Sequence, residues 1–98
     1  MIAKQIDPPG YLTLRVLFLI QQERQRQHAQ WGAQDLQPTE WLAILTEEVG
    51  EAAKSAFTLQ QSQHDPVFLE DLREELVQVA AVAVQWLESI ERTNERNT

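Results

Sequence analysis

The fold is decided by residues 65–90, which read DPVFLEDLREELVQVAAVAVQWLESI. Asp65 followed by Pro66 is a typical helix start, because aspartate caps the first free N–H groups and proline fits the first helical position. Apolar residues then recur every three or four positions up to Ile90, which is the spacing of one helix face. The stretch therefore predicts a long helix, with a fraying polar tail over residues 92–98.

Two further helices are predicted before this stretch. The first begins near Tyr11 and ends at about Gln30, because the following Trp31-Gly32 supplies a glycine for a left-handed terminal turn. We expect its apolar half, residues 11–20, to be a core helix segment, whereas residues 21–30 are polar on almost every side.

The second helix runs from about Pro38 to about Leu59, with either Thr39 as its cap or Pro38 in its first turn. Residues 1–10 contain Asp-Pro-Pro-Gly, which cannot continue a helix, and are interpreted as an N-terminal arm. The fold class is all-α.

Composition limits the function. Ninety-eight residues form one domain, residues 1–98, since a chain of this length rarely builds two stable cores. The net charge of −7 opposes binding to nucleic acid. The absence of cysteine excludes disulfides and zinc-thiolate sites. The longest apolar run is about ten residues, which is too short to span a membrane. The polar residues that follow it do not match the small-residue cleavage site of a secretory signal. We expect a cytoplasmic protein.

The apolar surface of the third helix is larger than one chain needs. A second apolar face around Val77, Ala81 and Val84 adds to the first. Short loops predict that neighbouring helices are antiparallel, and two other short helices cannot cover both faces. We expect an antiparallel helical hairpin bundle that is completed by homo-oligomerisation, as a homodimer or homotetramer.

Two acidic groups border the predicted core. Helical spacing places Glu48 and Glu51 within about 60° of each other at the edge of an apolar stripe. Glu75 lies on an apolar face of the next helix, where an unpaired carboxylate would be costly. A hard divalent cation that takes oxygen ligands, Mg²⁺ or Mn²⁺, is the natural partner of such a group. The alternative is that these glutamates are solvated surface residues.

The chain resembles a known family over about residues 22–91. Three segments carry the resemblance: Trp31-Gly32, then Glu47-Glu48-Val49-Gly50-Glu51-Ala52-Ala53-Lys54, then Arg73-Glu74-Glu75-Leu76-Val77-Gln78. The pattern is similar to the MazG-like all-α nucleoside triphosphate pyrophosphohydrolases. Members of that family carry a Glu-Glu-x-x-Glu motif and a Glu-x-x-Asp motif, bind Mg²⁺ and cleave between the α and β phosphates.

The resemblance implies a site, residue by residue. The metal ligands would be Glu48, Glu51 and Glu75, and Gln78 stands where the family usually has aspartate. Glutamine keeps a carbonyl oxygen as ligand but removes one negative charge. Glu47 or Glu48 would orient or deprotonate the attacking water. Trp31 would contact the substrate by stacking on the base. Lys54 and Arg73 flank the two motifs, and two roles are open for them: contacts to phosphate oxygens, or solvated pairing with neighbouring glutamates.

Two hypotheses of function follow. The first is a Mg²⁺-dependent pyrophosphohydrolase that converts a (deoxy)nucleoside triphosphate and water into the monophosphate and pyrophosphate. The second is a non-catalytic helical oligomerisation or nucleotide-sensing module of the same fold, in which Gln78 has removed catalytic competence.

Overall fold

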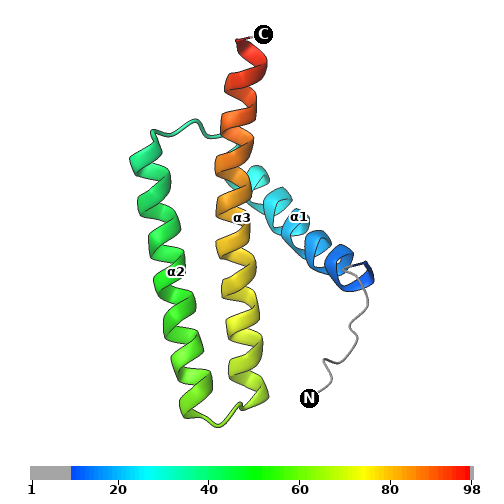
Figure 1. Cartoon of the computed structure of the whole chain (residues 1–98), viewed down its shortest axis with the longest axis vertical. Coiled ribbons are helices and arrows are strands. Elements are labelled where there is room, and N and C mark those ends of the chain that lie inside the picture. Colours follow the sequence, from blue (N-terminus) through cyan, green and yellow to red (C-terminus); the bar gives the residue numbers. More distant parts are fainter. Residues whose placement is uncertain (1–9, 98) are drawn as a thin grey trace, which may run out of the picture.

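Two antiparallel helices form the body of the molecule. The computed structural model describes residues 10–97, and within them the chain is all-helical with three helices and no strand. Helix α2 (Pro38–Gln61) and helix α3 (Pro66–Arg96) run side by side and are joined by a short turn (Figure 1). Asp65 caps α3 as expected, because its carboxylate accepts a hydrogen bond from the Val67 N–H at 3.0 Å.

The start of α2 differs in one detail from the sequence-based expectation. Gln37, rather than Thr39, is the cap: its backbone N–H donates to the Glu40 carboxylate at 2.9 Å, and its backbone oxygen accepts from the Glu40 N–H at 2.9 Å. Pro38 occupies the first turn. At the other end of the hairpin, Gln63 and His64 adopt positive φ angles of 59° and 68°, which tightens the turn.

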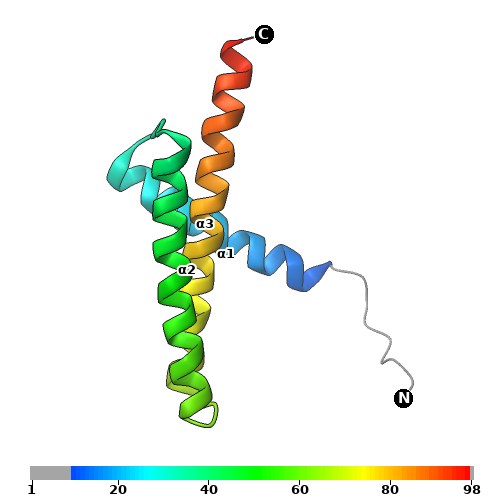
Figure 2. The same cartoon turned by 60° about the vertical axis from the view of Figure 1, so that its left-hand side comes forward.

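Helix α1 (Tyr11–Trp31) crosses α3 at a steep angle instead of lying along the pair (Figure 2). It ends at Gly32, whose φ of 70° favours glycine. The predicted arm lies outside the described residues except for Gly10, the residue that precedes the helix.

The expectation that residues 11–20 form a core segment is wrong. Residues 11–18 are exposed, and only Leu19 and Ile20 are partly covered. The buried residues of α1 are instead Arg24 and Gln27, from its polar half. The crossing angle explains why the polar half of α1 is buried and the apolar half is exposed. Helix α1 contacts α3 only near the crossing point, and its apolar start lies beyond that point.

The loop between α1 and α2 is fastened to α3. Arg92 donates to the Asp35 carboxylate at 2.9 Å and to the Gln34 backbone oxygen at 3.0 Å, and Ser89 also donates to Asp35. Helix α3 therefore continues to Arg96, where a fraying tail was expected from Arg92 onward. Thr98 lies outside the described residues.

The core of the hairpin is aromatic. Trp41 on α2 is only 1% exposed and stacks on Trp86 of α3, with ring centroids 6.5 Å apart and planes 12° from parallel. Ala81 is fully buried within this single chain, so it cannot belong to the oligomer interface that the sequence suggested around it. Over residues 10–97, none of the helices has both the length and the apolar character that crossing a membrane requires.

Candidate metal centre

Three glutamates from two helices converge between α2 and α3. Each of Glu48, Glu51 and Glu75 offers a carboxylate oxygen, and these three oxygens all lie within 4.8 Å of one another. Glu48 and Glu51 are one turn apart on α2, and Glu75 reaches them from the adjacent helix. The antiparallel pairing of α2 and α3 thus brings together residues that the sequence separates.

Burial and mutual repulsion disfavour ionisation of this cluster. The pKa of Glu48 is raised, first because the carboxyl is partly buried and then because Glu51, Glu75, Glu47 and Glu23 surround it with negative charge. Burial, the Glu51 charge and a hydrogen bond with Glu51 raise the pKa of Glu75.

The donor set fits a hard divalent cation. All three donors are carboxylate oxygens, which Mg²⁺ and Mn²⁺ prefer. Two oxygens on one Mg²⁺ lie about 3 Å apart in adjacent positions and about 4 Å apart in opposite positions, given metal–oxygen distances of about 2.1 Å. Side-chain shifts of about an ångström would therefore convert the observed separation into a coordination geometry.

A fourth glutamate, which sequence reasoning did not single out, approaches from α1. Glu23 is close enough to Glu48 for its charge to raise the pKa of that carboxyl. Its own pKa is lowered, mainly by the hydrogen-bonded guanidinium of Arg26 and further by a hydrogen bond from Gln78. Only the crossing of α1 over α3 creates this contact, so no pattern within one helix signals it.

Gln78 is held between two helices. Its carbonyl oxygen accepts a long hydrogen bond of 3.4 Å from the Gln27 side chain, and its amide donates to Glu23. The neutral amide therefore sits beside an acidic side chain of α1, where an aspartate would add a second negative charge. The structure provides a local reason for glutamine at this position.

The other predicted site residues are more dispersed. Glu47 is exposed and adjoins the cluster through Glu48. Lys54 lies one turn after Glu51, in a small hollow with Asp71. Arg73 pairs with Glu70 at 3.0 Å and lines a hollow that also contains Glu23 and Gln78.

Trp31 is not brought to the carboxylates within one chain. It is 61% exposed at the end of α1, and three residues later Gln34 is bonded to Gln85 of α3. Gln85 lies ten residues beyond Glu75, which corresponds to about 15 Å along a helix.

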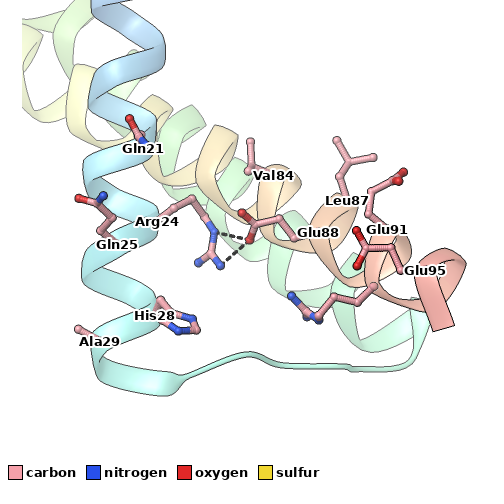
Figure 3. A pocket seen from close by; sticks show the side chains of 11 residues that line it. Gln21, Arg24, Gln25, His28, Ala29, Val84, Leu87, Glu88, Glu91 and Glu95 are labelled. Atoms are coloured by element: carbon pink, nitrogen blue, oxygen red, sulfur yellow. Dashed lines mark hydrogen bonds and ion pairs between the residues drawn. The ribbon is translucent and has the colours of Figure 1, made fainter.

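A larger hollow, of about 740 Å³, lies between α1 and the C-terminal half of α3 (Figure 3). Its floor is an ion pair in which the Nε and Nη2 atoms of Arg24 donate to one oxygen of Glu88 at 2.9 and 2.6 Å. Arg24 is only 8% exposed and also donates to Gln27. These bonds explain its burial as the anchor of α1, and the hollow lies apart from the three-carboxylate cluster.

Comparison of the chain with protein-family models, with curated proteins and with solved structures found no match. The resemblance to MazG-like pyrophosphohydrolases therefore stays a prediction that depends on the motifs and on the geometry described above.

Proposed function

We propose that the protein is a Mg²⁺-dependent nucleoside triphosphate pyrophosphohydrolase, which converts a (deoxy)nucleoside triphosphate and water into the monophosphate and pyrophosphate. The observation that carries the proposal is the convergence of Glu48, Glu51 and Glu75 within 4.8 Å. The two sequence motifs that resemble the family are the same segments that supply these three carboxylates.

Electrostatics supports a cation-dependent site. A protein of net charge −7 repels a triphosphate, and the crowded cluster adds to that repulsion. When bound, Mg²⁺ would supply positive charge to both the carboxylates and the phosphate oxygens. The raised pKa values of Glu48 and Glu75 are the expected property of carboxylates arranged for a cation.

We assign the individual roles in this reaction to side chains of the protein. Glu48, Glu51 and Glu75 would hold the metal, with Gln78 as a neutral oxygen ligand nearby. Glu47, which is exposed and next to Glu48, would orient or deprotonate a water molecule at the edge of the cluster. Arg73 and Lys54, which flank the two motifs in the sequence, would be the cations for phosphate oxygens, although Arg73 is paired with Glu70 in the metal-free protein.

The placement of Gln78 favours a second candidate of another class. Because its side chain bonds to Gln27 and Glu23, it is committed to joining α1 and α3. A nucleotide-sensing or oligomerisation module that binds metal without turnover would have this property. In both cases we propose an antiparallel hairpin bundle completed by a second copy of the chain.

The two functions are separated by a panel of canonical and damaged nucleoside triphosphates incubated with Mg²⁺ or Mn²⁺. The enzyme releases pyrophosphate and nucleoside monophosphate in equal amounts from at least one substrate. The non-catalytic module binds nucleotide without releasing pyrophosphate. A Glu75→Gln variant serves as the control for contaminating hydrolases.

A further inference from the structure

The first two turns of α1 form an exposed apolar surface. Six large apolar side chains of this segment are between 51% and 73% exposed: Tyr11, Leu12, Leu14, Val16, Leu17 and Phe18. Figure 2 shows this half of α1 projecting away from the α2–α3 pair. Single exposed apolar residues are ordinary, but a contiguous set of this size marks an interaction surface.

An apolar groove adjoins this projecting segment. A hollow of about 420 Å³ lies between α1 and the first half of α3, and its walls are almost entirely aliphatic. Val16, Leu19 and Ile20 form one wall, and Leu69, Leu72 and Leu76 form the other. One protomer thus presents a protruding apolar helix beside a matching apolar groove, which is the self-complementary arrangement that a two-fold dimer requires.

The area exposed by the chain matches what a dimer would bury. A compact monomer of 11.3 kDa exposes about 5,700 Å², whereas this chain exposes 7854 Å². If the ten residues outside 10–97 are left out, both from the mass and, with the area of an extended chain, from the exposed surface, about 900 Å² of excess remains. A standard interface buries about 800 Å² on each partner.

The charge of the protein favours a second copy of the chain, rather than a membrane, as the partner of this apolar surface. Arg15 is the only charged residue between Tyr11 and Gln22, whereas helices that lie on membranes carry several basic residues. The protein's net charge of −7 also opposes anionic lipids.

We propose that residues 11–18 of α1 dock into the α1–α3 groove of a second copy, and that this reciprocal exchange forms a homodimer. The groove includes Val77, one residue of the apolar face expected at an oligomer interface, whereas Ala81 of that face is buried within the protomer. This dimer is inferred from apolar exposure, area and charge, and it holds whether or not the carboxylate cluster is catalytic.

Sedimentation of the full chain, with matched phenylalanine variants, tests the proposal. Phe18 and Phe57 are both more than half exposed, but only Phe18 lies in the docking segment. The wild type and Phe57→Glu should sediment as dimers at micromolar concentration. Phe18→Glu should weaken the dimer about a hundredfold or more, because it would bury an unpaired carboxylate. A monomeric wild type, or a dimer lost in Phe57→Glu and kept in Phe18→Glu, would overturn the proposal.

Cross-linking keeps the test independent of a folding defect in Phe18→Glu. The chain has no cysteine, so Leu14→Cys and Leu76→Cys each introduce a single thiol. Mild oxidation of an equal mixture should produce a disulfide-linked species in which peptide mapping identifies a bond from position 14 in α1 of one variant to position 76 in α3 of the other. The absence of this species, or its equal formation with a Phe57→Cys control, contradicts the proposed contact. Binding of a monomer to anionic vesicles would assign the surface to a membrane and refute the dimer.

Discussion

The carboxyls of Glu51 and Glu75 lie within 4.8 Å of each other across the α2–α3 interface, and the charge of Glu51 helps to raise the pKa of Glu75. With Glu48 they form a group whose oxygens lie within 4.8 Å. Like charges at this separation repel unless a proton or a cation lies between them. The stability of the packing between α2 and α3 therefore depends on whether the charge of this cluster is neutralised.

Neutralising one member of the cluster should separate its role in function from its role in stability. We expect Glu51→Gln and Glu75→Gln each to abolish Mg²⁺-dependent turnover while leaving helical content unchanged. Without metal, each variant should melt a few degrees higher than the wild type, since about 1 kcal/mol corresponds to roughly 4–8 °C for a domain of this size. Circular dichroism melts and pyrophosphate assays measure the two effects. Glu91→Gln on the exposed side of α3 is the matched control, and full activity in either cluster variant would refute the site.

The pH dependence of stability should carry the signature of the cluster. The native pKa values of Glu48 and Glu75 lie above the ordinary value of 4.5, so the native state retains protons that the unfolded chain releases. Stability of the metal-free protein should therefore fall as pH rises from 4.5 through the raised native values. Stabilisation by Mg²⁺ should grow over the same range, because the cation displaces protons. Thermal melts at several pH values, with and without Mg²⁺, measure both slopes. A Mg²⁺ effect that is independent of pH contradicts binding at this cluster.

Gln78→Asp should strengthen metal binding and weaken the metal-free fold. Aspartate supplies a hard anionic ligand one turn from Glu75, but it removes the hydrogen bond to Glu23 and adds repulsion there. If the protein is an enzyme, the variant needs less Mg²⁺ for half-maximal pyrophosphate release. If it is a non-catalytic module, the wild type is silent and the variant gains activity. Gln78→Asn controls for side-chain size without charge, and identical metal dependence in all three proteins would place position 78 outside the site.

The bonds between Asp35 and Arg92 should hold the last turns of α3. Hydrogen bonds from Arg92, assisted by Ser89, lower the pKa of Asp35 below its ordinary value of 3.8. We expect Asp35→Asn to increase amide hydrogen exchange over residues 92–96 at neutral pH. The difference from the wild type should shrink as pH falls through the native pKa of Asp35, because protonation then weakens the same bonds. Equal exchange at neutral pH would show that α3 needs no support from the loop.

Periodicity predicted those parts of the molecule that depend on one helix at a time. The all-α class, the Asp65 cap and the shared face of Glu48 and Glu51 follow from spacing along a single element. The crossing of α1 over α3 does not follow from such spacing, because the ion pair that holds it joins Arg24 and Glu88, which are far apart in sequence. Contacts between residues far apart in sequence also explain why α3 extends past Arg92 and why Glu23 approaches the cluster.

Product analysis with Mg²⁺ and a nucleoside triphosphate tests the central claim most directly. Wild-type protein should release pyrophosphate and nucleoside monophosphate in a one-to-one ratio, and Glu75→Gln should release neither above background. Release of inorganic phosphate with a nucleoside diphosphate, or pyrophosphate release that persists unchanged in Glu75→Gln, would contradict a pyrophosphohydrolase centred on these three carboxylates.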